Sequence, residues 1–102
     1  MILLEKIPEK DRKFLVMLPL IANWIKRNKY LSEAELRIYQ EMYAEQVEIA
    51  LSIPESKMLE FLGRYHEDAF YGSYVKIILS HEGIERLRGI LRQLREFRDK
   101  GK

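Results

Sequence analysis

The sequence predicts a mainly α-helical domain that contains one small β-hairpin, and three observations lead to this expectation. Apolar residues recur every three or four positions near both ends of the chain, which is the spacing of amphipathic helices. In the middle, residues 46–62 read QVEIALSIPESKMLEFL, two short apolar-periodic segments that a proline separates. Residues 74–79 read YVKIIL, whose aromatic and β-branched side chains are typical of a strand.

Length and composition indicate one folded domain over residues 1–102. Hydrophobic residues make up 47% of the chain and charged residues 33%, as in ordinary globular proteins. The sequence has no cysteine, which excludes disulfides and thiolate chemistry and favours the reducing cytoplasm. Together with the high Lys, Arg and Glu content, this is also typical of a thermophile protein. The longest apolar run, residues 14–22, is shorter than the roughly 20 residues that cross a bilayer, so we expect no membrane segment.

The formal net charge of +2 is unevenly distributed along the chain. Counting Lys and Arg against Asp and Glu, residues 1–30 carry +4, residues 31–80 carry −5 and residues 81–102 carry +3. Two basic ends therefore flank an acidic middle, and any hypothesis about an anionic partner has to accommodate that pattern.

An N-terminal helix is predicted over residues 8–28, with Pro8 in its first turn, where the missing N–H costs nothing. Its apolar side chains cover most of the circumference, so the helix requires burial on most sides. Two explanations remain open: a partner subunit covers it, or it is the central core helix of the domain. On the first explanation, the dimer interface combines this helix with the last one and comprises Phe14, Leu18, Ile21, Trp24, Ile25, Leu91, Leu94 and Phe97.

Serines mark the starts of two further helices. Ser32 is followed three residues later by Glu35, which is the pattern of a capping box. Ser80 follows the predicted strand and is a natural N-cap for a C-terminal helix over residues 80–99. One face of that helix is apolar, and much of the remainder consists of Arg86, Arg88, Arg92, Arg95 and Arg98.

Two segments resemble the winged-helix (winged helix-turn-helix) DNA-binding domains. Residues 46–62 are similar to their pair of orthogonal helices joined by a tight turn. Residues 70–87 resemble the wing, in which a hairpin leads through a Leu-Ser/Thr-x-x-Gly-x-x-x-Leu pattern into the next helix; here this pattern runs from Leu79 to Leu87. The resemblance implies a helix-turn-helix and wing over residues 32–79, between an N-terminal and a C-terminal helix. It also implies a transcriptional regulator that binds duplex DNA as a dimer.

In that family the second helix of the pair enters the major groove, and the wing contacts an adjacent groove or the backbone. The DNA-binding residues that the resemblance implies, together with arginines of the last helix, are Ser56, Lys57, Arg64, Ser73, Lys76, Arg86, Arg88 and Arg92. The electrostatics oppose this interpretation. Four acidic residues lie in or beside the helix that carries Lys57 and Arg64, whereas affinity for DNA depends largely on basic side chains.

A second hypothesis is a protein–protein interaction module or a subunit of a larger assembly. The acidic middle, the apolar first helix and the coiled-coil-like spacing of Leu87, Ile90, Leu94 and Phe97 favour it. In addition, Leu18-Pro19-Leu20-Ile21-Ala22 and the arginine-rich last helix resemble the helical domain of replication-fork GINS subunits, which implies an assembly that handles DNA replication.

The sequence predicts no catalytic residues, no metal site and no cofactor. His66 and His81 have no metal-ligand spacing. Glu45 and Glu48 lie one helical turn apart, but no His, Lys or Ser is placed to complete an acid–base site with them. We therefore expect a non-enzymatic protein, whose partner is duplex DNA, a second copy of the chain or another protein.

Overall fold

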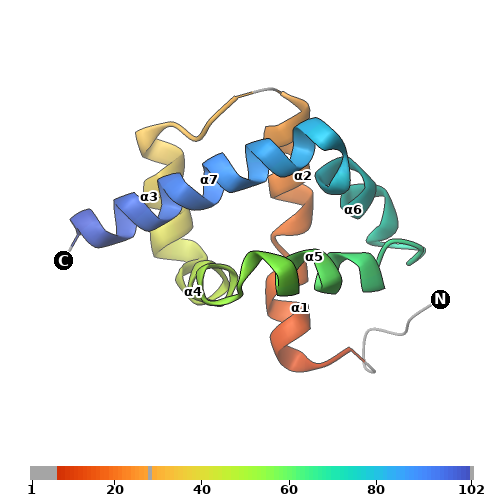
Figure 1. Ribbon diagram of the computed structural model, residues 1–102. Coiled ribbons are helices and arrows are strands. Elements are labelled where there is room, and N and C mark those ends of the chain that lie inside the picture. Colours follow the sequence, from red (N-terminus) through yellow and green to blue (C-terminus); the bar gives the residue numbers. More distant parts are fainter. Residues whose placement is uncertain (1–6, 28, 102) are drawn as a thin grey trace.

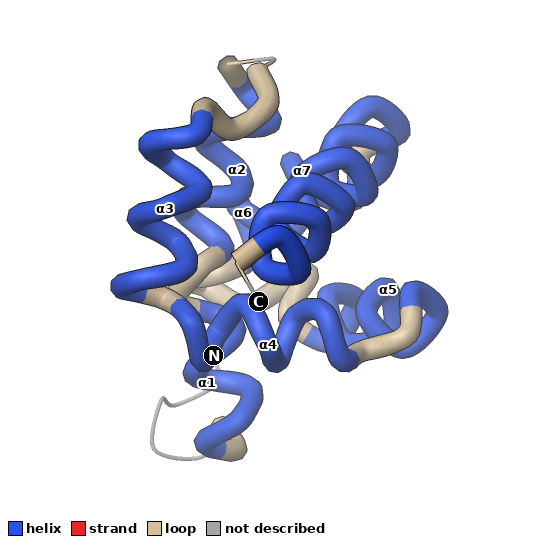
Figure 2. Tube along the Cα trace, turned by 90° about the vertical axis from the view of Figure 1, so that its left-hand side faces the viewer, coloured by secondary structure: helices blue, strands red, loops and turns tan. Residues whose placement is uncertain are grey.

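The computed structural model describes residues 7–27 and 29–101 and folds them into seven α-helices (Figure 1). Within these residues there is no β-strand, as Figure 2 also shows. The predicted winged helix-turn-helix fold is therefore wrong, because its β-hairpin wing is replaced by a helix. The helices are α1 (Glu9–Leu15), α2 (Leu18–Lys26), α3 (Glu33–Met42), α4 (Ala44–Ser52), α5 (Glu55–Arg64), α6 (Gly72–Leu79) and α7 (His81–Lys100).

Helix α6 occupies the segment that the sequence predicts as a strand. Tyr71, Val75 and Ile78 are all buried on the core side, and their spacing of four and three residues is that of one helical face. In a strand, Val75 and Ile78 would point to opposite faces, so only the helix buries both. The turn before α6 is held by Asp68, whose Oδ1 accepts hydrogen bonds of 2.8 Å from the backbone N–H groups of Phe70 and Tyr71. Burial of one face overrides the local preference for a strand.

The Leu-Ser-x-x-Gly pattern marks a corner between two helices and is not the exit of a wing. Ser80 ends α6 in an extended conformation, and its Oγ accepts a 3.1 Å hydrogen bond from the backbone N–H of Gly83 in the first turn of α7. A Cβ on Gly83 would overlap the carbonyl oxygens of Ile77 and Ile78 at the end of α6. The serine therefore caps α7, as predicted, and the glycine lets the two helices meet closely.

The predicted helix over residues 8–28 is two helices, α1 and α2, with a break at Val16 and Met17. Pro19 is the reason, because it has no N–H to donate to Leu15 and its ring would collide with that carbonyl in a continuous helix. The proline is instead accommodated in the first turn of α2, where no such bond is needed. Asn28, the predicted end of the helix, lies outside the described residues.

Helix α2 lies at the centre of the molecule and contacts both α6 and α7 (Figure 1). Leu18 and Ile21 of α2 are at most 1% exposed, and Ile25 is also buried. Helix α1 packs separately on α4 and buries Phe14 and Leu15 there. Most of the apolar circumference of the N-terminal region is thus covered by the chain's own helices, with Val16 at the break 47% exposed. This favours the central-core explanation of the two that the sequence left open.

Helix α7 crosses the molecule from α6 to α3 and also contacts α2 and α4 (Figures 1 and 2). The predicted capping box is confirmed, since Ser32 and Glu35 bond to each other's backbone N–H groups at the start of α3. The segment before α3 is fixed to α7 by Gln93, whose side-chain amide makes two 3.0 Å hydrogen bonds with the backbone N–H and C=O of Leu31.

In the described ranges, 7–27 and 29–101, no helix is both long and apolar enough to cross a membrane. The same part of the chain contains no group of three or more Asp, Glu or His side chains arranged to hold a metal ion.

Candidate functional site

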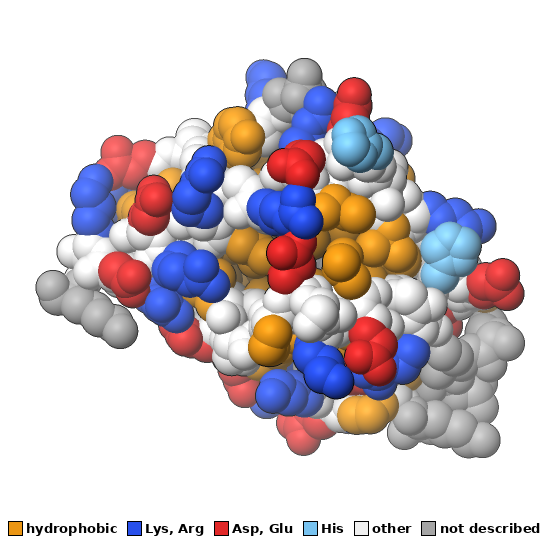
Figure 3. Space-filling view, viewed as in Figure 1, with side chains coloured by type: hydrophobic (Ala, Val, Ile, Leu, Met, Phe, Trp, Pro, Cys, Tyr) orange, Lys and Arg blue, Asp and Glu red, His pale blue; other side chains and the backbone are white. Residues whose placement is uncertain are grey.

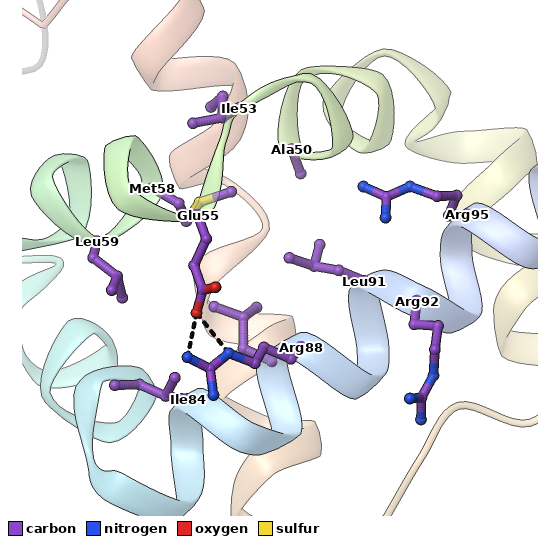
Figure 4. Close-up of a pocket in the computed structure, with 11 residues that line it drawn as sticks. Ala50, Ile53, Glu55, Met58, Leu59, Ile84, Arg88, Leu91, Arg92 and Arg95 are labelled. Carbon is purple, nitrogen blue, oxygen red and sulfur yellow. Dashed lines mark hydrogen bonds and ion pairs between the residues drawn. The ribbon is translucent and has the colours of Figure 1, made fainter.

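An open groove of about 230 Å³ runs between α4, α5 and α7. Figure 4 shows that charged side chains at its edge surround a largely apolar floor. The floor is formed by Ala50, Ile53, Met58, Leu59, Ile84, Leu87 and Leu91, and the edge by Glu55, Arg88, Arg92 and Arg95.

The local sequence explains how the groove forms. Pro54 cannot continue α4 and becomes the N-cap of α5, so the two helices follow one another along one side of α7 (Figure 1). On α7, Ile84, Leu91 and Arg95 follow at intervals of seven and four residues and so share one face. Because Leu59, Ile84 and Leu91 are only half-buried, their apolar surface remains accessible within the groove. Figure 3 shows hydrophobic side chains at the surface between α7 and α5.

One ion pair crosses the groove. The Arg88 guanidinium lies 2.5 Å from Oε1 of Glu55 on α5 and 2.5 Å from Oε1 of Glu85 on its own helix. The hydrogen bond with Glu55 is the main reason that the pKa of Arg88 is raised above its ordinary value. About half of each side chain is exposed, so this pair adds little to stability. Its effect is to position Arg88 across the groove (Figure 4).

Arg92 and Arg95 carry positive charge at the edge of the apolar floor. Both are exposed, and neither makes an ion pair with another residue of the described ranges. In Figure 4, Arg95 extends from α7 toward α4, whereas Arg92 points away from the floor. The neighbouring Arg98 differs from both, because it is paired with Glu48 at 3.0 Å and with Asp99 at 3.1 Å.

The structure brings together only part of the predicted DNA-binding set. Arg88 and Arg92 meet at the groove, together with Leu91 from the predicted dimer interface. Lys57 and Arg64 line a different cavity, on the side of α5 that faces α1, where Lys57 lies 3.6 Å from Glu60 and Arg64 lies 4.0 Å from Asp11. Ser56 is exposed near the start of α5, and Ser73 and Lys76 are exposed on α6.

Arg86, another predicted DNA contact, has a structural role instead. Its Nη1 donates a 2.7 Å hydrogen bond to the backbone carbonyl of Ile25 in the last turn of α2, and its side chain is only 25% exposed. The carbonyls of a last helical turn have no partner within the helix, so Arg86 satisfies one of them and ties α7 to α2.

We expect Arg86→Gln to lower the free energy of unfolding by about 1 to 2 kcal/mol, because a partly buried carbonyl loses a charged donor. Urea denaturation followed by circular dichroism measures this change. Arg92→Gln is the matched control on the same helix and should change the value by no more than about 0.5 kcal/mol, because Arg92 is exposed. Equal effects of the two substitutions would contradict the capping role of Arg86.

Most of the predicted dimer interface lies inside the chain's own core. The buried members are Phe14, Leu18, Ile21, Ile25 and Leu94. The other three, Trp24, Leu91 and Phe97, are half-buried. Trp24 is fixed within the molecule, since its Nε1 donates a 2.7 Å hydrogen bond to the hydroxyl of Tyr39. The core members present no surface to a partner in this fold.

Part of the uneven charge distribution along the chain is balanced by ion pairs between helices. Basic residues of the terminal segments pair with acidic residues of α4 and α5, in Lys13–Glu45 at 2.5 Å, Arg88–Glu55 at 2.5 Å and Arg98–Glu48 at 3.0 Å. Three acidic residues of the middle therefore pair with three basic residues of the ends. Arg92 and Arg95 remain outside these pairs.

Sequence reasoning missed Leu59 and Ile84 as site residues, because their periodicity is that of ordinary core positions. The charge pattern was the available signal. The segments 31–80 and 81–102 carry opposite charge, which favours contact between them, and the groove lies where they meet; this inference was not drawn from the sequence.

The chain shows no significant match to any known protein family, curated protein or solved structure, so its function has to be inferred from these residues.

Proposed function

We propose that this chain is a non-enzymatic protein-interaction module that binds a helical segment of a partner protein in the groove between α4, α5 and α7. The observation behind this proposal is the accessible apolar floor formed by Leu59, Ile84 and Leu91 beside the exposed Arg92 and Arg95. Apolar surface that the chain itself leaves uncovered, with polar side chains around it, is characteristic of interaction sites. The chain has no cysteine, in keeping with a cytoplasmic site of action.

The dimensions of the groove suit a helix better than a small molecule. From Ile84 to Arg95 the face of α7 extends about 16 Å, which is about three turns of a helix lying alongside it. The volume of about 230 Å³ is below the roughly 300–1,000 Å³ of typical small-molecule pockets. A groove of this kind accommodates a few apolar side chains from one face of an amphipathic helix.

The lining residues also favour binding over catalysis. Glu55 is the carboxylate of the lining set, and it is paired with Arg88 at 2.5 Å. No serine, histidine or lysine belongs to that set. A general acid–base or nucleophilic mechanism needs such groups within hydrogen-bond reach of one another.

Binding of duplex DNA, which the sequence resemblance implied, has less support. Lys57 lies next to Glu60, Arg64 next to Asp11, and Arg86 is bonded to the end of α2. A DNA-binding surface requires basic side chains that are available to phosphates along one face. In addition, the wing that would contact a second groove is replaced by α6.

The proposal is tested by selection from a displayed library of helical peptides of about four turns. Apolar residues are fixed at positions i, i+3 and i+7, and the remaining positions are drawn equally from Glu, Gln, Lys and Ala. We expect the folded chain to enrich peptides that bind it with dissociation constants in about the micromolar range, as measured by isothermal titration calorimetry.

Two variants identify the binding surface. Leu91→Gln changes the floor of the groove, and Ile38→Gln makes the same kind of change at a residue of α3 that is 47% exposed and lies outside the groove. Binding should weaken at least tenfold in the first variant and remain unchanged in the second, with circular dichroism confirming that both are folded. Enriched peptides that bind both variants equally, or the absence of enriched peptides, would refute the proposed function.

A further inference from the structure

The charges around the groove indicate which helix fits it. Resting on the proposed function, we infer that the occupant is an acidic amphipathic helix, whose carboxylates pair with Arg92 and Arg95 while its apolar face covers Leu59, Ile84 and Leu91. The charged lining residues are three arginines and one glutamate, and the glutamate already neutralises Arg88. Glu85 pairs with Arg88 as well, so Arg92 and Arg95 are the lining arginines that make no ion pair within the described residues.

The arrangement along α7 matches the pattern of such a helix. Arg88, Arg92 and Arg95 follow at intervals of four and three residues, so they lie on one side of α7, next to the floor residues Ile84 and Leu91. A second helix lying along α7 would carry its apolar side chains at the same intervals and place polar side chains at its margins opposite the arginines. Figure 3 shows basic side chains on α7 beside the exposed hydrophobic surface.

The arginines beside the groove differ from the basic residues elsewhere on α7. Arg86 is held by the carbonyl of Ile25, and Arg98 is held by Glu48 and Asp99. Arg92 and Arg95 have no such partners among the described residues. A guanidinium binds a carboxylate through two parallel hydrogen bonds, which makes it better suited to this contact than a lysine.

Glu55 would oppose the same ligand. Its carboxylate lies in the groove and bonds to Arg88, as Figure 4 shows, so an incoming carboxylate is repelled by Glu55 and competes with it for Arg88. Removing the charge of Glu55 and removing the charge of Arg95 should therefore change the affinity for an acidic helix in opposite directions. Glu55→Gln should strengthen the binding of an acidic helix, and Arg95→Gln should weaken it.

A nucleic acid would also bring negative charge to Arg92 and Arg95, but the rest of the groove does not suit it. Phosphates gain nothing from contact with Leu59, Ile84 and Leu91. The carboxylates of Glu55 and Glu85 beside Arg88 oppose either anionic ligand, so the apolar floor is what distinguishes a helix from a nucleic acid. An acidic helix satisfies both the apolar and the basic part of the lining. Duplex DNA is therefore included in the test as a competing ligand.

The first measurement uses the peptide library described above. Because Glu, Gln, Lys and Ala start with equal frequency at the variable positions, the enriched peptides report the charge preference directly. We expect Glu to exceed Lys at the positions flanking the apolar stripe. Enriched peptides that depend on Leu91 but are neutral or basic would overturn this inference and leave the proposed function intact.

The second measurement compares variants with the best enriched peptide by isothermal titration calorimetry at two salt concentrations. The double variant Arg92→Gln, Arg95→Gln should bind about tenfold more weakly, and Glu55→Gln about two- to fivefold more tightly. Lys57→Gln, at an exposed residue that lines another cavity, is the control and should leave the affinity unchanged. An affinity that is insensitive to salt and to the arginine variants would refute the acidic occupant. Displacement of the peptide by duplex DNA at equal concentration would refute it as well.

Discussion

Gly83→Ala is expected to reduce the free energy of unfolding by more than about 3 kcal/mol, enough to unfold many domains of this size. The new methyl group would overlap the carbonyl oxygens of Ile77 and Ile78. These are backbone atoms at the end of α6, and they cannot move aside without displacing the fully buried side chain of Ile78. Urea denaturation measures the loss if the variant folds, and circular dichroism shows the loss of helix if it does not.

Gly63→Ala is the matched control for this prediction. Gly63 is also helical, but it is exposed on α5, and a Cβ there would meet no atom within 4 Å. Because alanine loses less backbone entropy than glycine when a helix forms, this substitution should stabilise the protein by about 0.5 to 1 kcal/mol. If Gly83→Ala were as stable as Gly63→Ala, this would contradict the close contact between α6 and α7 at Ser80.

Raising the pH from about 10 to 12 is expected to destabilise the protein by several kcal/mol. Burial raises the pKa of Tyr39 to about 12. Burial, followed by the hydrogen bond that the hydroxyl donates to Asp11, raises the pKa of Tyr65 to about 12 as well. The folded state thus favours the protonated tyrosines, so their stabilising contribution is complete below pH 10 and is lost as the pH rises through 12. A shift of this size corresponds to about 2 to 3 kcal/mol for each tyrosine.

Denaturation at a series of pH values between 8 and 12 measures this loss. Tyr39→Phe removes the acceptor of the Trp24 hydrogen bond and should cost about 1 kcal/mol at neutral pH. Above pH 10, however, its stability should fall less steeply than that of the unaltered chain. Tyr30→Phe is the control, because Tyr30 is 58% exposed, and it should leave the slope unchanged. A free energy of unfolding that is constant over this range would contradict the buried state of both hydroxyls.

Features of the fold that depend on neighbouring residues were predicted from the sequence. The capping box of Ser32 and Glu35, the N-cap at Ser80 and the separation of two helical segments by the proline in 46–62 are all present. Each is specified by hydrogen bonds or steric limits within a few residues, so it forms in almost any surroundings. Pro19 belongs to the same class, and its effect on the first helix was predictable but overlooked.

The strand predicted over residues 74–79 failed for a different reason. Its β-branched residues favour a strand only when the neighbouring structure offers a sheet, and no strand occurs in the described part of the chain. The face that α6 buries against the core, with Tyr71, Val75 and Ile78, depends on the position of α2 far away in the sequence. The composition of six neighbouring residues carries no information about a contact with a helix so distant in the sequence.

The candidate site was predicted only in part. Arg88, Arg92 and Leu91 were selected from the sequence for two different surfaces, DNA contact and dimerisation, and the structure places them at one groove. They are three and four residues apart on α7 and so share one side of it, and that side faces the groove because α4 and α5 border it there. The groove could not be predicted from α7 alone, since five of its eleven lining residues come from the segments on either side of Pro54.

The sequence by itself determined where α3 and α7 begin, that the chain has no thiol chemistry, and that its ends and middle carry opposite charge. Those properties depend on residue types and on interactions over three or four positions. Only the tertiary structure decided which arginines form hydrogen bonds or ion pairs within the molecule and which border its surface without such contacts. Arg86 and Arg92 have identical side chains on one helix, yet one caps α2 and the other borders an uncovered apolar floor, because different helices pack beside them.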